Sequence, residues 1–327
     1  MKLLEVENLI QEWNFNYMKV FVDCGHDHVL MKRMIPYWNK CGVSVSPLPN
    51  GCDVHLSFTH FITHTNLPKV LRLDGVYYDC ATDYTSRNSN LDASTKIANG
   101  IIYQSAFAKK WCYRYLSDNE TAKTDIIYNG INPMWCGLHI DNDIFDILLI
   151  SNWRRWKRLR EMTEVFLEFK RTTSDKVHLH IIGNHDYKVD DRCITYYGEL
   201  SHEDSKHLFQ IADASMHIAK RDWCPNSLIE TLGAGVPVLT TDAEGGAKEI
   251  IRIVDESFIC SGDNNENEKL YQYTDEYNKL SINAKNNLIN SLNNCKMNKY
   301  RSCHKLQFNI EYVAWRYLRM LESVCQK

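Results

Sequence analysis

The chain has 327 residues, 44% of them hydrophobic, which is enough for one large core or two of ordinary size, and domain-size statistics favour two. A formal net charge of −3 argues against a protein that coats nucleic acid or an anionic membrane, so any anionic ligand must be held locally. The 12 cysteines include no Cys-x-x-Cys pair, and no apolar run approaches the roughly 20 residues of a membrane span.

These features predict a soluble, cytoplasmic protein with reduced thiols. The first residues include acidic side chains where a signal peptide would be apolar. Cys24 and His26 could supply half of a zinc site, but no second pair follows, and structural zinc requires four ligands. We therefore expect no metal centre.

Short β-branched runs alternate with helical patterns along the chain, which indicates strands joined by crossover helices in parallel sheets. Short apolar strands of this kind are typical of parallel strands that are buried on both faces. The predicted strands of the first half cover residues 19–23, 43–45, 53–57, 68–72, 100–103 and 125–128. The fold class is therefore α/β.

The second half repeats the alternation. Strands are predicted at 145–150, 177–182, 194–197, 214–218 and 236–240, and helices at 157–170 and 201–212. Ser201 is the expected N-cap of the second helix, with Asp204 three residues on. Turn-forming residues at 129–133 and polar residues at 141–143 indicate an interdomain linker.

The predicted domains are residues 1–142 and 143–307. Residues 308–327 place apolar side chains near one helical face, so a terminal helix must cover something apolar. We expect this helix to pack back towards the N-terminal domain, and an ordinary core helix is the alternative.

The most informative stretch runs from Asp222 to Leu239 and predicts a loop, a short helix and a strand. Asn226 or Ser227 can cap the helix, whose free backbone N–H groups and positive dipole end suit a diphosphate. Glu230 then lies beside that phosphate site, where a carboxylate can accept hydrogen bonds from both hydroxyls of a ribose. Taken singly, each residue is better explained by an ordinary helix cap, an exposed glutamate or a Gly-Pro turn, and only their combined order favours a ligand site.

Two acids separated by seven residues and followed by Gly-x-Gly-x-Pro-Val resemble the signature of retaining glycosyltransferases of family 4 (group 1). Residues 242–249 are similar to the Gly-Gly turn and acid that follow this signature. The resemblance implies a GT-B fold, in which two Rossmann-like domains face each other across a cleft, with a C-terminal crossover helix. It also implies that Asp222 contacts the donor sugar, that Asn226, Ser227 and Leu228 contact the diphosphate, and that Glu230 binds the ribose. Asp222 stands where the family usually has Glu.

A cluster of cations follows the strand predicted at 145–150, namely Arg154, Arg155, Lys157 and Arg158. Ligands of open α/β sheets gather at such carboxyl ends. Cations at a helix start oppose the helix dipole, which favours a bound anion over the alternative of a solvated basic turn. The resemblance implies that Lys157, together with Arg154 or Arg155, neutralises the leaving diphosphate.

Three further segments are similar to parts of the family. Tyr197, Gly198 and Leu200 resemble the loop that packs the nucleotide base, although adjacent tyrosines are as common in a core. Asp74 follows a strand and resembles the residue that faces the donor sugar, a plain Asp-Gly turn being the alternative. Gly25 lies where the family usually has a glycine-rich loop.

The resulting hypothesis is a retaining glycosyltransferase of the hexosyltransferase type. It moves a sugar from a nucleoside diphosphate sugar, with UDP or GDP as the nucleotide, to a hydroxyl of a glycan or glycoconjugate. Asp74, Lys157 and Asp222 are the catalytic candidates, and catalysis is chiefly electrostatic.

We expect no tightly bound cofactor, no nucleic-acid partner and no requirement for a metal, because the cationic loop can replace Mg²⁺. The alternatives are an epimerase or a phosphorylase on the same architecture, or a protein that binds nucleotide sugars without turnover.

Overall fold

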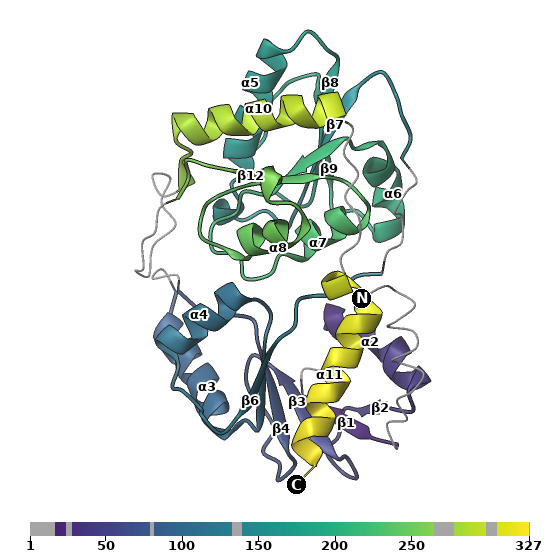
Figure 1. The fold of residues 1–327 in the computed structure, drawn as a ribbon, viewed down its shortest axis with the longest axis vertical. Helices are drawn as coiled ribbons and strands as arrows, with labels where there is room; N and C mark the ends of the chain where they lie inside the picture. The colour runs from purple at the N-terminus through teal and green to yellow at the C-terminus, as the bar shows by residue number, and fades with distance from the viewer. Residues whose placement is uncertain are drawn as a thin grey trace. The chain divides into compact units, whose positions relative to one another are not determined.

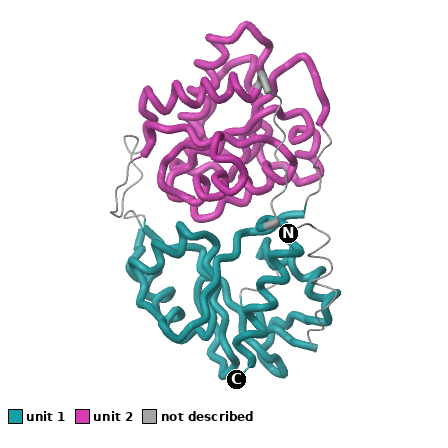
Figure 2. The backbone as a smooth tube through the Cα atoms, viewed as in Figure 1, with its two compact units in different colours: residues 1–132, 305–327 teal, residues 133–304 magenta. Residues whose placement is uncertain are grey.

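The computed structural model describes residues 17–23, 28–78, 82–132, 139–264, 278–298 and 306–326. The chain forms two compact units, one of residues 1–132 and 305–327 and the other of residues 133–304 (Figure 2). Each unit contains a six-stranded sheet in which every pairing is parallel, so the predicted α/β class is confirmed. The residues discussed above for a signal peptide, a zinc pair and a glycine-rich loop near Gly25 lie outside the described ranges.

The sheet of unit 1 has the strand order β2-β1-β3-β4-β5-β6 (Figure 1). Its strands are β1 (Lys19–Val22), β2 (Ser44–Ser46), β3 (Val54–Phe58), β4 (Lys69–Leu73), β5 (Gly100–Tyr103) and β6 (Lys123–Ile126). Helices α2 (Val29–Lys40) and α11 (Ile310–Cys325) cover one face, and α3 (Tyr84–Ile97) and α4 (Ala106–Tyr115) cover the other. The short strands predicted from the sequence lie within one or two residues of these bounds.

Helix α11 completes the core of unit 1. Asn309 caps its start by accepting hydrogen bonds from the backbone N–H groups of Glu311 (2.8 Å) and Tyr312 (3.2 Å). The indole N–H of Trp38 in α2 donates to the carbonyl of Ala314 at 3.0 Å, in a buried contact. The buried stripe of the helix consists of Ile310, Val313, Ala314, Tyr317, Leu318, Met320 and Leu321. Leu318 and Leu321 of this stripe belong to the apolar face expected from the sequence, whereas Tyr312 and Trp315 of that face are only half-buried.

A short extended segment after β6 holds the start of α11. Ile131 donates to the carbonyl of Phe308 at 2.9 Å, and Ile310 donates back to Ile131 at 3.0 Å. Gly130 lies so close to the helix that a Cβ atom there would be 2.9 Å from the Cα of Ile310. Glycine is therefore required at position 130, because a side chain there would block the close approach of this segment to α11.

The sheet of unit 2 has the order β12-β11-β10-β7-β8-β9. Its strands are β7 (Phe145–Ile150), β8 (Val177–Ile182), β9 (Ile194–Gly198), β10 (Ala214–Met216), β11 (Val238–Thr241) and the two-residue β12 (Ile259–Cys260), which the sequence pattern missed. Its helices are α5 (Leu159–Thr172), α6 (His202–Ile211), α7 (Asn226–Gly233), α8 (Gly246–Val254) and α10 (Ile282–Asn298). Short 3-10 turns are η1 (Arg155–Lys157) and η2 (Glu256–Phe258), with η3 (Leu306–Phe308) in unit 1.

The order of the strands in unit 2 reverses between β7 and β10. The chain proceeds from β7 to β8 and β9 on one side, and from β10 to β11 and β12 on the other. The loops after β7 and β10 therefore leave the same edge of the sheet side by side, which is where ligands of open α/β sheets bind. Ser201 caps α6 as predicted, since its hydroxyl oxygen accepts from the N–H of Asp204 at 3.1 Å.

We predict that Gly130→Ala lowers the free energy of unfolding by about 1–3 kcal/mol, because the added methyl group forces α11 away from the segment after β6. Urea titration followed by circular dichroism measures this change. Arg319→Ala on the exposed side of α11 is the matched control and should change stability by less than about 0.5 kcal/mol. Equal effects of the two substitutions would contradict this account of the packing.

Candidate functional site

The loop after β7 folds tightly over the end of β8. The indole N–H of Trp153 donates to the carbonyl of Ile182 at 2.9 Å. Gly183, at the end of β8, has a φ of +110°, and a Cβ atom there would be 1.8 Å from the carbonyl oxygen of Ser151. This close contact between Gly183 and Ser151 fixes the position of the basic residues that follow Trp153.

Arg158 is a structural residue rather than a ligand-binding one. It adopts a left-handed backbone conformation with a φ of +61° at the junction of η1 and α5, and its side chain is fully buried. The guanidinium donates to both carboxylate oxygens of Asp263, at 2.5 and 3.0 Å, and to the carbonyl of Asn278 at 2.8 Å. Arg158 therefore anchors the loop within unit 2 and cannot contact a ligand. Of the four cations, Arg154, Arg155 and Lys157 remain as candidates for binding one.

Lys157 and Asp222 form an ion pair, so two of the predicted catalytic residues lie together. Each side chain is 15% exposed. Nε2 of His217, the residue after β10, lies 3.3 Å from the same carboxylate oxygen of Asp222. Burial by itself would raise the pKa of Asp222, but Lys157 and His217 outweigh it and hold that pKa well below its usual value. Asp222 is therefore ionised throughout the physiological range.

His217 was not identified from the sequence. Its side chain is 7% exposed. Burial lowers the pKa of its ring below the usual value, and the nearby Asp222, which raises that pKa, only partly offsets burial and the positive charge of Lys157. The only sequence signal was its position at the carboxyl end of a strand that leads into the acid motif. We take it as a third member of the polar cluster formed by Lys157, Asp222 and His217.

The Gly-Gly turn of residues 245–246 fixes the backbone of Asp222. The N–H of Gly246 donates to the carbonyl of Asp222 at 2.6 Å, and the N–H of Arg221 donates to the carbonyl of Glu244 at 2.8 Å. A Cβ atom at Gly246 would lie 2.1 Å from the carbonyl oxygen of Trp223. Glycine is required here because the start of α8 touches the acid loop directly.

Helix α7 begins four residues after Asp222, and its N-cap is Pro225, which makes no side-chain capping bond. The expectation that Asn226 or Ser227 caps the helix is wrong, because the helix starts at Asn226. Both residues, together with Leu228, form the first turn, whose backbone N–H groups have no partner within the helix. Glu230 follows on the next turn and is half-buried.

Arg154 and Arg155 line a cavity of about 170 Å³ between the loops after β7 and β8. Arg155 pairs with Glu161 at 3.1 Å, whereas Arg154 is exposed and its guanidinium lies 5.3 Å from the ring centroid of Trp156. The full lining consists of Trp153, Arg154, Arg155, Leu159, Arg160, His185, Asp186 and Tyr187. The two arginines thus share the loop of Lys157 and add positive charge beside it.

Tyr197 is half-buried and belongs to a polar chain that runs into the sheet. Its hydroxyl lies 2.8 Å from Nδ1 of His180, and Nε2 of His180 lies 2.9 Å from Asp146. Gly198 has a φ of +68° and accepts a hydrogen bond from Gly183 at 2.7 Å. Leu200 packs against the core between the sheet and α6. The hydroxyl of Tyr197 is therefore engaged in the protein interior, and a role for these residues in base binding stays a prediction.

Asp74 lies in unit 1 and forms an ion pair with the buried Arg72. Arg72 also donates to the side-chain oxygens of Gln104 (3.0 Å) and Asn129 (2.6 Å). The side chain of Asp74 is 38% exposed, so it can still reach a ligand. The Asp-Gly turn is thus backed by a hydrogen-bonded network that the sequence did not reveal.

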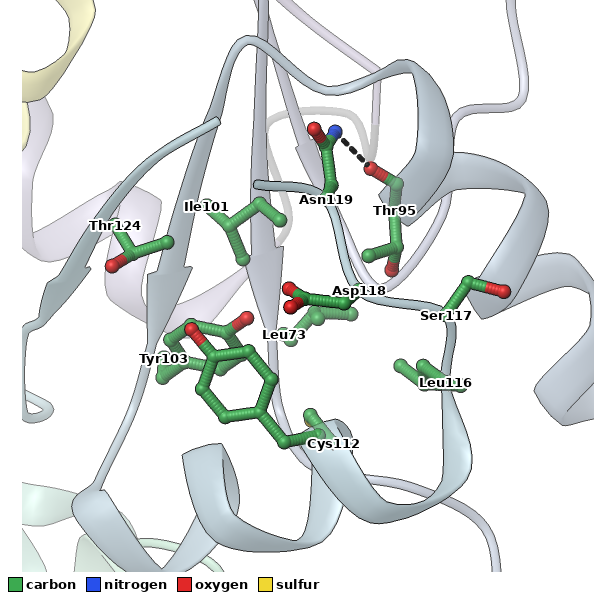
Figure 3. Close-up of a pocket in the computed structure, with 11 residues that line it drawn as sticks. Leu73, Thr95, Ile101, Tyr103, Cys112, Leu116, Ser117, Asp118, Asn119 and Thr124 are labelled. Carbon is green, nitrogen blue, oxygen red and sulfur yellow. Dashed lines mark hydrogen bonds between the residues drawn. The ribbon is translucent and has the colours of Figure 1, made fainter. Parts of the chain in front are cut away.

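A second hollow, in unit 1, is too small to bind a substrate. It lies between β5 and the loop after α4, and its volume is about 10 Å³, which is room for roughly one water molecule (Figure 3). Burial raises the pKa values of both Cys112 and Tyr103 at its wall, so these groups keep their protons. Asn119 closes one side with a hydrogen bond to the carbonyl of Thr95 at 2.8 Å.

The described residues contain neither a metal-binding cluster nor a membrane-spanning helix. They contain no group of three or more His, Cys, Asp or Glu side chains arranged to hold a metal ion. No helix within these ranges combines the length and the apolar character needed to cross a membrane.

The sequence model of a family described as "Glycosyl transferases group 1" matches residues 138–287, which lie in unit 2 and include Lys157, Asp222 and Glu230. No curated protein sequence matches the chain significantly.

Solved structures match over nearly the whole chain. Sucrose-phosphate synthase from Thermosynechococcus elongatus is 12% identical, with a TM-score of 0.63, over 94% of this chain and 99% of that one. Anabaena HepE, solved in complex with UDP and glucose, is 12% identical, with a TM-score of 0.58, over 94% and 100%. The lipopolysaccharide outer core galactosyltransferase WaaB, in its apo form, is 11% identical, with a TM-score of 0.58, over 94% and 99%. The likeness confirms the predicted fold class, two Rossmann-like domains of the GT-B kind.

A double-mutant cycle tests the ion pair. We expect Lys157→Met and Asp222→Asn each to lower the free energy of unfolding, and the double variant to lose less than their sum, with a coupling of about 1–3 kcal/mol. Because the folded-state pKa of Asp222 is depressed, its contribution is lost only as the pH falls through that low value. The ion pair is therefore intact at about pH 8, where the coupling is measured. Additive effects in urea denaturation would show that the two charges do not interact.

We predict that Gly246→Ala lowers the free energy of unfolding by about 1–3 kcal/mol, since its methyl group cannot fit against the carbonyl of Trp223. Thermal and urea denaturation measure the loss. Arg252→Ala, on the exposed side of α8, is the control and should change stability by less than about 0.5 kcal/mol. A variant as stable as the wild type would mean that the Gly-Gly turn does not hold the acid loop.

Proposed function

We propose that the protein is a retaining glycosyltransferase of family 4 that transfers a sugar from a nucleoside diphosphate sugar to an acceptor hydroxyl. The observation that supports this most directly is the pairing of Lys157 with Asp222 at the switch point of the unit 2 sheet. Lys157 and Asp222, the first acid of the predicted motif, are 65 residues apart in the sequence. They meet at the edge of the sheet where α/β proteins bind ligands. This region also lies inside the match to the glycosyl transferase family model.

In this proposal the diphosphate is held from two sides. Lys157 supplies a full positive charge, and the first turn of α7 supplies free N–H groups and the positive end of the helix dipole. Arg154 adds charge from the same loop as Lys157. These groups stabilise the negative charge that grows on the diphosphate as the bond to the sugar breaks, which lowers the barrier to transfer.

The two acids of the motif have different tasks. Glu230, one turn further along α7, accepts hydrogen bonds from the ribose hydroxyls, and Asp222 orients the sugar. Asp74 of unit 1 is a further candidate for sugar contact. The diphosphate oxygens can accept the proton of the acceptor, so the proposal needs no separate base and no metal. The same chemistry is consistent with retention at the anomeric carbon.

UDP-sugars are the donors to test first, because HepE was solved with UDP and glucose. GDP-sugars come next. For the acceptor, a glycan or glycoconjugate is the proposed class, as the outer core galactosyltransferase WaaB is among the similar structures.

One observation favours a second candidate, a protein that binds nucleotide sugars without turnover. Asp222 is shorter than the Glu usual at this position, and it is drawn towards Lys157 instead of projecting freely. Release of free nucleotide from a bound donor, with or without an acceptor, separates the two functions. An epimerase would instead convert the free donor into its isomer with no acceptor present.

We predict that Lys157→Ala lowers kcat about 100- to 1,000-fold, because the departing diphosphate loses its main counter-charge. The donor is first identified by a thermal-shift panel of UDP- and GDP-sugars, and turnover is then followed as nucleotide release. Lys176→Ala, at an exposed position in unit 2, is the control and should leave turnover unchanged. A rate equal to that of the wild type for Lys157→Ala would remove this lysine from the site.

A further inference from the structure

The ion pair between Lys157 and Asp222 poses a problem for the proposed donor site. If the diphosphate is to use the charge of Lys157, the ammonium must turn from Asp222 towards phosphate. Asp222, which is 15% exposed, then keeps its negative charge with its main counter-ion drawn away and a second anion nearby. A charge in such a place is costly unless another group compensates it.

His217 is placed to compensate that charge. Its Nε2 lies 3.3 Å from Oδ2 of Asp222, the oxygen that Lys157 also contacts. Nε2 is buried, and its contact with Asp222 falls short of a well-directed hydrogen bond. A poorly satisfied buried nitrogen costs free energy, so the ring gains when this contact strengthens on release of Asp222 from Lys157.

The surroundings of His217 contain few other charges. The neighbouring strand β11 contributes uncharged groups, since Leu239 accepts from the backbone of His217 at 2.8 Å and Thr240 donates to its carbonyl at 2.7 Å. Arg158 and Lys220 both lie near Asp263 beyond Ile218, and burial lowers the pKa of Lys220 to about 8, but neither cation acts on the ring of His217. The charges that act on the ring are therefore those of Asp222 and Lys157, and donor binding changes the balance between them.

We propose that His217 takes up a proton from solvent when a nucleoside diphosphate sugar draws Lys157 away from Asp222. This inference rests on the proposed function. No covalent bond forms or breaks apart from the one to the proton, which leaves water or a buffer acid and binds the bare ring nitrogen. Both ring nitrogens then carry hydrogen, and the imidazolium pairs with the Asp222 carboxylate. His217 is thus a positioning residue that keeps Asp222 neutralised in the donor complex.

The sign of the pH dependence follows from this exchange. In the donor-free protein, burial and Lys157 lower the pKa of His217, so the ring is neutral at about pH 7. In the complex the cation has moved towards phosphate and Asp222 acts alone, which raises that pKa. The complex therefore holds more protons than the free protein, and donor affinity increases as the pH falls.

Isothermal titration calorimetry of the full chain tests the proposal. The probe is whichever of UDP-glucose, UDP-galactose, UDP-N-acetylglucosamine and GDP-mannose binds most tightly. Their phosphates are diesters and do not themselves titrate near neutral pH. Titrations in buffers of different ionisation enthalpy should show uptake approaching one proton per donor. Affinity should weaken by up to about tenfold for each unit of rise in pH between about 6 and 8.

His217→Gln should abolish both the proton uptake and the pH dependence, whereas His207→Gln, at an exposed position of α6, should keep both. Asp222→Asn gives an independent test if His217→Gln fails to fold, because an imidazolium has no carboxylate to pair with in that variant. Donor binding with no proton uptake in the wild type overturns this inference alone, and so does uptake that persists in the folded variants. If no sugar nucleotide binds, the proposed function fails and this inference fails with it.

Discussion

The ion pair between Lys157 and Asp222 is the interaction on which the candidate site depends. Two opposite charges in a largely enclosed place stabilise each other only if the backbone holds both within contact distance. Two separate contacts meet that condition, one for each loop. Arg158 fixes the loop of Lys157 by its buried bonds to Asp263, and Gly246 fixes the loop of Asp222 by a backbone contact. The pair is therefore prepared by the fold before any ligand arrives.

Arg154 and Arg158, four residues apart in the sequence, have different positions in that arrangement. Arg154 is exposed and lines a cavity, whereas Arg158 is fully buried. The left-handed backbone of Arg158 turns its side chain inwards, and Asp263 supplies the counter-charge. A charged residue in a binding loop can thus stabilise the loop instead of contacting a ligand. Its type alone does not distinguish a ligand-binding role from a structural one.

The sequence predicted much of the fold because hydrophobic periodicity reflects burial. The strands and α5 to α7 appear close to their predicted places, and Ser201 caps α6 as expected. The two-residue strand β12 is too short for a periodic signal. The site was only partly predictable, since the acid motif is local in sequence, but the partners of each acid come from distant segments. His217 and Arg72 became apparent only when the fold placed them beside Asp222 and Asp74.

The position of α11 has a consequence for how the chain is made on the ribosome. Unit 2 is one continuous stretch, whereas unit 1 needs residues from both halves of the chain to fill its core. During synthesis, unit 2 can fold as soon as its last helix has left the exit tunnel. The sheet of unit 1, although translated earlier, has an apolar face that α2 covers only in part until α11 is made, so unit 1 completes its core after unit 2.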